Sequence, residues 1–131
     1  MTGAASGGTL TVDLAALAAN WRSLRGRAAP AECAAVVKAD AYGIGIEPAV
    51  AALAAAGCRT YFVAHLSEAR RARHACPDGT VYVLNGLLPG TEHAYLPDGI
   101  RPVLGSREEA ADWAAFCRAR GRLLPAALHV D

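Results

Sequence analysis

The apolar residues of this chain follow two spacings, and each spacing predicts a different secondary structure. Helical spacing begins after Asp13, a suitable N-cap residue, and continues to Gly26, a residue type common at helix ends. The apolar stripe of this predicted helix is formed by Leu14, Leu17, Ala18, Trp21 and Leu24. Residues 9–12 alternate between apolar and polar instead, which predicts a short strand before the helix.

Strand and helix patterns then alternate to the end of the chain. Short apolar runs predict strands at 33–37, 60–64, 80–84, 100–104 and 126–130. Helices are expected from Pro48 to Gly57, from Ser67 onward, around 91–96, and from Ser106 to Gly121. This order predicts an α/β protein with a parallel sheet and right-handed crossover connections.

Two architectures fit this order of elements: an open doubly wound sheet, or part of a (β/α)8 barrel. A complete barrel needs about 250 residues, whereas this chain has 131. Five strands follow the first helix, and no helix follows the last strand to cover it. We therefore expect part of a larger fold, with the remaining elements outside this sequence.

Composition and charge exclude several classes of protein. The chain is 53% hydrophobic and 19% charged, which is too apolar for a disordered protein. Its net charge of +1 gives no overall field that would attract nucleic acid or an anionic membrane. No apolar run reaches the roughly 18 residues of a membrane span, and residues 1–8 lack the features of an export signal. We expect a flexible leader at 1–8 and a cytoplasmic protein.

Several residue types that often carry chemistry are expected to be structural here. The four cysteines lack the spacing of a metal site, so free thiols and no bound metal are expected for Cys33, Cys58, Cys76 and Cys117. A structural or solvated role is expected for His65, and a solvated outer face for the arginines Arg70, Arg71 and Arg73. His129 and Asp131 close the last expected strand, and a catalytic pairing of the two has no third member in view. The helix positions of Trp21 and Trp113 indicate core residues.

Lys38 is the one lysine in a chain that carries 12 arginines. It closes the apolar run 33–37, at the strand end where barrels and doubly wound sheets place their active sites. A partly desolvated amine there is a nucleophile that condenses with aldehydes, including that of pyridoxal phosphate. The alternative is a structural lysine whose ammonium group reaches solvent past the strand end.

A glycine-rich turn follows Lys38 at residues 39–45. Gly43 and Gly45 allow the backbone to approach a ligand, and the helix expected at Pro48 begins just beyond them. Such a turn before a helix is typical of phosphate-binding sites, and the Tyr42 hydroxyl could donate to a phosphate oxygen. Tight strand-to-helix turns also use glycine for geometry alone, so the two glycines by themselves leave both interpretations open.

Residues 35–45, Ala-Val-Val-Lys-Ala-Asp-Ala-Tyr-Gly-Ile-Gly, closely resemble the cofactor-lysine signature of the alanine racemases. That signature is Lys-Ala-(Asp/Asn)-Ala-Tyr-Gly-x-Gly, and Ile44 stands at x where histidine is common. The resemblance continues through the segments expected to form the next strands, namely 57–69, 81–86, 101–106 and 128–131. Gly105 stands where asparagine or histidine is usual in the family.

The resemblance implies a partial (β/α)8 TIM barrel of about five βα units at residues 9–131, without the family's C-terminal β domain. The strand expected at 9–12 would belong to that missing domain. Lys38 would carry pyridoxal 5′-phosphate as an internal aldimine and act as acid or base on one face of the substrate. Tyr42 would hydrogen-bond the cofactor phosphate, and Val36 and Leu84 would line the barrel near the cofactor ring.

The implied activity is interconversion of L- and D-alanine, which supplies D-alanine for peptidoglycan, by a cytoplasmic homodimer. In the family the opposite-face base is a tyrosine from the partner subunit's second domain, and nothing in this sequence matches it. We therefore expect the isolated chain to be inactive. Three alternatives remain: a racemase for another amino acid such as serine, a pyridoxal-phosphate-binding barrel protein without racemase activity, and a truncated product without cofactor function.

Overall fold

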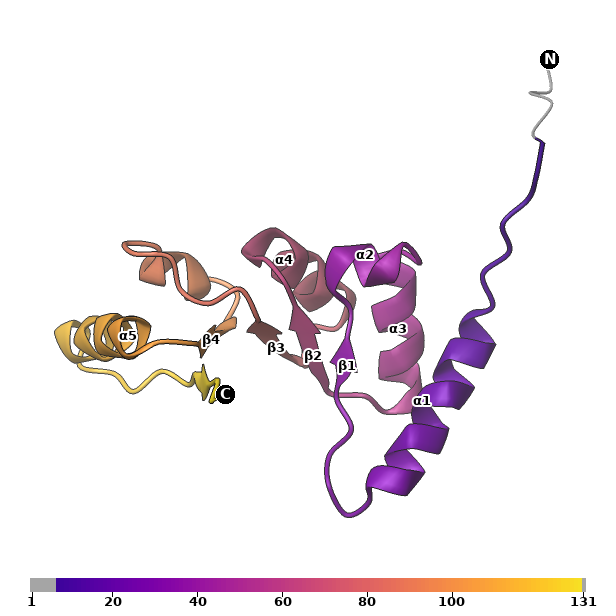
Figure 1. Ribbon diagram of the computed structural model, residues 1–131, viewed down its shortest axis with the longest axis horizontal. Coiled ribbons are helices and arrows are strands. Elements are labelled where there is room, and N and C mark those ends of the chain that lie inside the picture. The colour runs from indigo at the N-terminus through magenta and orange to yellow at the C-terminus, as the bar shows by residue number, and fades with distance from the viewer. Residues whose placement is uncertain (1–6, 131) are drawn as a thin grey trace.

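The computed structural model describes residues 7–130, and it arranges them as one curved parallel sheet with helices along its outer side (Figure 1). The strands are β1 (Ala35–Val36), β2 (Thr60–Val63), β3 (Thr80–Val83), β4 (Arg101–Leu104) and β5 (Ala127–Leu128). They lie in the order β1-β2-β3-β4-β5, and each neighbouring pair is parallel. A doubly wound sheet reverses its strand order, so this sequential order confirms the partial barrel.

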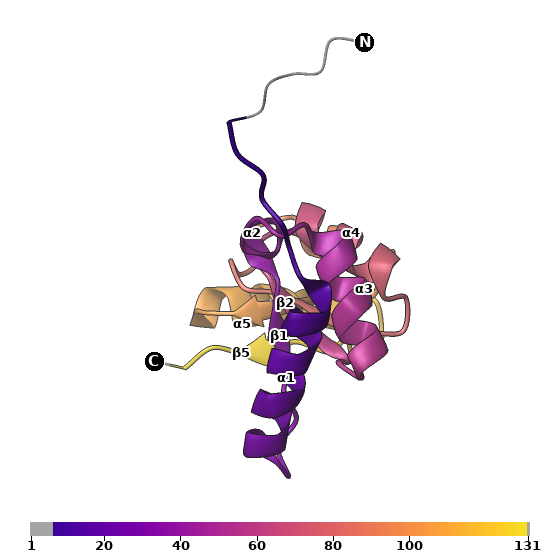
Figure 2. The same ribbon diagram turned by 90° about the vertical axis from the view of Figure 1, so that its right-hand side faces the viewer.

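The helices follow the strands in chain order and pack against the sheet. They are α1 (Leu14–Ala28), α2 (Lys38–Tyr42), α3 (Ile46–Ala56), α4 (Leu66–Ala75) and α5 (Arg107–Ala119), with a 3-10 turn, η1 (Glu92–Tyr95). Figure 2 shows α1 crossing in front of β1 at one end of the sheet. Among the described residues, no helix combines the length and the apolar character needed to cross a membrane.

The core lies between the sheet and its helices. In β2 and β3 every second side chain is fully or nearly fully buried there, namely Tyr61, Val63, Val81 and Val83. The alternate residues point to the other side, the inner face of the barrel, because side chains alternate along a strand. Phe62 and Tyr82 are neighbours on that inner face and stack with ring centroids 5.1 Å apart.

Two tryptophans form hydrogen bonds to the loops that lead from helices into strands. The Trp21 indole of α1 donates to the carbonyl of Cys33, 3.1 Å away, just before β1. The Trp113 indole of α5 donates to the carbonyl of Leu124, 3.2 Å away, just before β5. Both side chains are buried, which confirms the core positions expected for them. A buried indole N–H needs a hydrogen-bond partner. Here each of these bonds also ties the loop before the next strand to the preceding helix.

The strand expected at residues 9–12 is wrong for this structure. These residues are exposed and run away from the body of the molecule, and they join no sheet in the part of the chain that the structure describes (Figure 2). A strand forms only when a second backbone pairs with it, so an alternating pattern alone is not enough. Of the leader expected at 1–8, only Gly7 and Gly8 lie within the described residues.

The other elements agree with the sequence pattern apart from their ends. α1 continues through Gly26 to Ala28, because glycine inside a helix costs only about 1 kcal/mol and does not by itself end it. α3 begins at Ile46 rather than Pro48. The helix expected around 91–96 is the shorter turn η1. The free thiols expected for the four cysteines are confirmed.

Candidate active site

Lys38 lies just beyond the carboxyl end of β1, as the first residue of α2. The Val37 N–H still donates to the carbonyl of Phe62 on β2, at 2.8 Å, so the chain is held beside β2 up to this point. Ala35 and Val37 are buried against the helices, whereas Val36 is 47% exposed on the opposite side. Val37 leaves the extended conformation, with φ −123° and ψ 25°, so Lys38 begins the turn that follows β1. Its side chain is half-buried.

The residues after Lys38 form a left-handed turn. Ala39, Asp40, Ala41 and Tyr42 have φ angles of 51–54°, and the turn ends at Gly43 with φ 88°. Left-handed backbone costs roughly 1–2 kcal/mol for each L-residue that carries a Cβ atom. Four such residues in succession persist only when their surroundings hold them, and backbone strain of this kind is typical of functional sites.

Two side chains of α4 hold the left-handed turn. The Glu68 carboxylate accepts from the Asp40 N–H at 3.2 Å, and also from the Ala64 and His65 N–H groups at 2.8 and 3.3 Å. Arg71 donates to the Asp40 carboxylate at 2.7 Å. The same Asp40 oxygen accepts from the N–H of Ile46, the first residue of α3, at 3.0 Å. The turn is therefore tied to β2, α3 and α4 at once.

The Glu68 carboxyl group beside the left-handed turn is held in its charged form. Burial alone would raise the pKa of Glu68, but hydrogen bonds from four backbone N–H groups outweigh burial and leave that pKa below its ordinary value. Those four donors belong to Ala64, Asp40, His65 and Ala39. Glu68 is therefore an anion wherever the protein is folded at neutral pH.

We expect the Glu47 carboxyl to titrate with a pKa of about 2, against an ordinary value of 4.5. The chief cause is its pair of hydrogen bonds from Arg71, both 2.6 Å, followed by its own backbone N–H. A lowered pKa in the folded state means that this pair stabilises the fold above pH 4.5 and loses its effect as the pH falls towards 2. Carbon-13 NMR titration measures this directly. Arg71→Ala should return the pKa to its ordinary range, Arg70→Ala should not, and an unshifted Glu47 in the unaltered chain would contradict the pairing.

The other residues expected at the site are only partly brought together. Val36 and Tyr42 both line a groove of about 270 Å³ between α1 and β1, and the Tyr42 side chain is 65% exposed. Leu84 is on the same inner face but two strands away, in a pocket of about 460 Å³ that it shares with Gly105 and His129. Lys38, Val36 and Tyr42 therefore surround the end of β1, while β2 separates them from Leu84.

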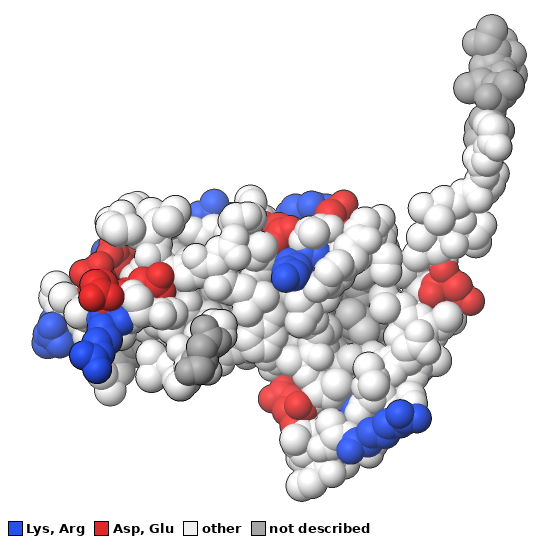
Figure 3. Space-filling view, in the orientation of Figure 1, with Lys and Arg blue, Asp and Glu red and all other residues white. Residues whose placement is uncertain are grey.

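The surface between the helices carries few charges. In the view of Figure 3, charged side chains gather near α2 and α4, over α5 and along α1, while the surface between them is mostly uncharged. On β3 and β4, Arg101 donates to the Tyr82 hydroxyl at 3.0 Å, and its guanidinium lies 5.5 Å from the centre of the Tyr82 ring. An apolar face with few, fixed polar groups is typical of a cofactor or substrate site.

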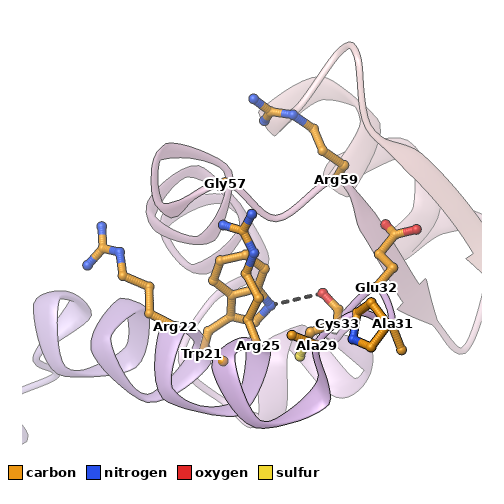
Figure 4. Close-up of a pocket in the computed structure, with 11 residues that line it drawn as sticks. Trp21, Arg22, Arg25, Ala29, Ala31, Glu32, Cys33, Gly57 and Arg59 are labelled. Carbon is orange, nitrogen blue, oxygen red and sulfur yellow. Dashed lines mark hydrogen bonds between the residues drawn. The ribbon is translucent and has the colours of Figure 1, made fainter.

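A separate pocket of about 690 Å³ lies at the opposite ends of the strands (Figure 4). Gly57 and two arginines, Arg25 and Arg59, are among its lining residues. The Arg25 guanidinium lies 5.5 Å from the Trp21 ring centre, and Arg59 donates to the carbonyl of Ala54 near the end of α3. Barrel active sites lie at the carboxyl ends of the strands, and Arg25 and Arg59 already have partners within the chain. We therefore place the candidate site at Lys38.

Two of the three arginines of α4 lie on the solvated face expected for them, since Arg70 and Arg71 are both exposed. Arg70 forms an exposed ion pair with Asp98 at 3.3 Å, and Arg71 also joins the left-handed turn to α3. Arg73 differs: it is partly buried and donates to the carbonyls of Pro77, Gly79, Asp98 and Gly99. Sequence reasoning missed Glu68 and Arg71 because their partners lie up to 31 positions away. The one local signal was the spacing of Glu68 from His65, which fits a capping box.

Comparison with known proteins identifies the family. Residues 12–131 match the family described as alanine racemase, N-terminal domain. The chain is 68% identical over 125 residues to the alanine racemase of Methylobacterium sp. (strain 4-46), and 52% identical over 128 residues to that of Brucella abortus (strain 2308). These alignments cover 95% and 97% of this chain but only 34% and 32% of those proteins.

A solved structure agrees with the sequence comparison. The chain superposes with a TM-score of 0.85, at 40% identity, on the crystal structure of alanine racemase from Bartonella henselae with covalently bound pyridoxal phosphate. The superposition covers 88% of this chain and 32% of that one. This chain thus spans about a third of the length of its relatives, and over that third it belongs to the alanine racemase family, as an N-terminal domain.

Proposed function

We propose that this chain forms the first part of the barrel of a pyridoxal-phosphate-dependent alanine racemase, and that Lys38 is its cofactor lysine. One observation carries the proposal: the chain's single lysine lies just beyond the carboxyl end of β1, where a strained turn begins. The covalently bound pyridoxal phosphate of the Bartonella henselae relative supports the choice of cofactor.

The residues around Lys38 fit pyridoxal phosphate in chemistry and in space. Lys38 offers a primary amine for the aldehyde, and the exposed Tyr42 offers a hydroxyl that can donate to a phosphate oxygen. Beyond Tyr42 the backbone is open, since a Cβ atom added at Gly43 would meet nothing within 4 Å. The positive φ angles of Gly43 and Gly45 let the chain turn tightly there before α3 begins.

Lys38 and Tyr42 would have different roles at the site. Pyridoxal phosphate, when bound, supplies an aldehyde that bonds to an amine and a ring that stabilises negative charge on the adjoining carbon. Tyr42 would hold the phosphate end, which fixes the position of the cofactor relative to β1. Lys38 would take or return a proton on the face of the substrate carbon that it approaches.

We propose that the second proton group comes from outside this chain. Racemisation needs a proton removed from one face of the carbon and returned on the other, and Lys38 serves only one face. For the whole protein we further propose a homodimer whose partner subunit supplies that group, a cytoplasmic location, and D-alanine for peptidoglycan as its product. The chain alone is expected to give no turnover.

A chimera tests the proposed activity. The chain would replace the matching third of the Methylobacterium sp. (strain 4-46) alanine racemase, to which it is 68% identical. We expect the chimera to convert L-alanine into D-alanine, at rates well above those with L-serine. Turnover of serine but not alanine would show a different racemase, and cofactor binding without any turnover would indicate a barrel protein that binds pyridoxal phosphate for another purpose.

Tyr42→Phe is expected to weaken pyridoxal phosphate binding by the chimera about tenfold or more, because a hydrogen bond to a charged group contributes roughly 1.5–3 kcal/mol. Absorbance titration with the cofactor measures the change. Tyr95→Phe is the control, since the Tyr95 hydroxyl donates to the carbonyl of Gly86 at 2.9 Å, outside the candidate site. An unchanged dissociation constant in Tyr42→Phe would remove Tyr42 from the phosphate site.

A further inference from the structure

The contacts between α4 and the left-handed turn carry an inference that rests on the proposed function. We propose that Glu68 and Arg71 are positioning residues for Lys38: they hold the turn at 39–42 in its strained form and thereby set the direction in which the Lys38 amine leaves β1. Neither residue needs to touch the cofactor or the substrate for this role.

The first step of the argument is that the turn needs an external restraint. Its own backbone bonds include Ala41 N–H to the Val37 carbonyl at 3.0 Å and Gly43 N–H to the Ala39 carbonyl at 3.1 Å. Four consecutive L-residues with positive φ nevertheless disfavour this conformation. Without support from elsewhere, the segment would relax towards negative φ, and Lys38, at the start of the turn, would move with it.

Glu68 supplies the stronger restraint. One carboxylate oxygen accepts from Asp40, two residues after Lys38, and the other accepts from Ala64 and His65. Val36 pairs with Phe62 in the register of β1 and β2, and Lys38 and Ala64 each lie two residues beyond that pair. Glu68 therefore bridges the ends of β1 and β2 beside Lys38. Charge-assisted bonds to backbone N–H groups are among the stronger hydrogen bonds in proteins.

Arg71 closes the network from the next turn of α4. It binds Glu47 through two parallel bonds of 2.6 Å, and through the same guanidinium it reaches the Asp40 carboxylate at 2.7 Å. These side chains are roughly half exposed, and exposed ion pairs contribute little individually. We therefore expect Arg71 to matter less than Glu68, and mainly by keeping Asp40 in place to receive the Ile46 N–H.

If Glu68 had a purely structural role, a different experimental result would be expected. Glu68 also accepts from the His65 N–H and so caps the start of α4. If capping were its whole role, its loss would lower stability and leave the reactivity of Lys38 unchanged. Asp13, which caps α1 by accepting from the Ala16 N–H at 3.0 Å, provides a matched acidic cap on another helix.

The test is competition for pyridoxal phosphate between the two amines of the 131-residue chain, Lys38 and the N-terminal amine. Each amine condenses with the aldehyde and loses water, and borohydride then adds hydride to the C=N carbon to fix the label. Peptide mapping gives the ratio of label at Lys38 to label at the N-terminus. We expect Glu68→Ala to lower this ratio about tenfold and Arg71→Ala about threefold, as misplaced reacting groups do, with an intermediate value for Glu68→Gln.

The controls separate the two proposals. Asp13→Ala and Arg70→Ala should leave the ratio unchanged, and hydrogen exchange at 39–44 should speed up only in the Glu68 and Arg71 variants. If the unaltered chain favours Lys38 and Glu68→Ala favours it equally, the positioning role is overturned while the proposed function stands. If the unaltered chain shows no preference for Lys38 over the N-terminal amine, both proposals are overturned.

Discussion

Lys38→Ala is expected to reduce alanine racemisation by the chimera at least about 10³-fold, because the variant loses both the amine that bonds the cofactor and the proton group on one face of the substrate. The chain has no second lysine that could take over either role. The measurement is the initial rate of D-alanine formation at saturating L-alanine and pyridoxal phosphate.

Lys38→Arg distinguishes the chemistry of Lys38 from its charge. Arginine keeps the positive charge but does not become a neutral nucleophile near neutral pH, so this variant should be as inactive as Lys38→Ala. Arg70→Ala, which removes an exposed ion pair with Asp98 and a hydrogen bond to the Ala94 carbonyl, both away from Lys38, should keep full activity. If Lys38→Arg retained more than a tenth of the rate, Lys38 would act through charge alone, contrary to the proposed mechanism.

Trp21→Ala is expected to destabilise the 131-residue chain by about 3–5 kcal/mol, the usual cost of truncating a buried aromatic side chain. The Trp21 side chain is 6% exposed and joins the hydrophobic core. Its indole N–H also holds the Cys33 carbonyl, so its loss frees the loop that positions β1. Urea unfolding monitored by circular dichroism gives the change in free energy of unfolding.

Trp21→Phe separates packing from the hydrogen bond. Phenylalanine fills part of the same space but donates no hydrogen bond, so we expect an intermediate loss. Leu123→Ala serves as the surface control, because Leu123 is 99% exposed and substitutions at such positions usually change stability by less than about 0.5 kcal/mol. A Trp21→Ala variant as stable as Leu123→Ala would show that α1 is not anchored to the core through this residue.

The sequence was sufficient for most of the fold because the strands are short apolar runs between clear helix signals. Strands β2, β3 and β4 lie within one residue of the expected limits. The strand order could not be read from the pattern, since periodicity reports which face is buried and not which strand is the neighbour. The incorrect strand prediction at residues 9–12 has the same cause: the alternating pattern does not show whether a partner backbone is present.

The position of Lys38 was predictable, but the form of the turn after it was not. The apolar run 33–37 was enough to place Lys38 at the carboxyl end of β1. Ala39 and Ala41 carry no local signal for positive φ, and only glycine was expected to adopt it. The groups that hold the turn come from α4, 28 to 31 positions later in the chain, and such distant partners become visible only in the folded structure.

The most direct test of Lys38 as the cofactor lysine is borohydride reduction of the unaltered 131-residue chain with limiting pyridoxal phosphate, followed by peptide mapping. Pyridoxal without the phosphate and the urea-unfolded chain are the controls. We expect the label to lie on Lys38 in strong preference to the N-terminal amine, and this preference to vanish with pyridoxal or in urea. Equal labelling of the two amines in the folded chain would contradict the assignment.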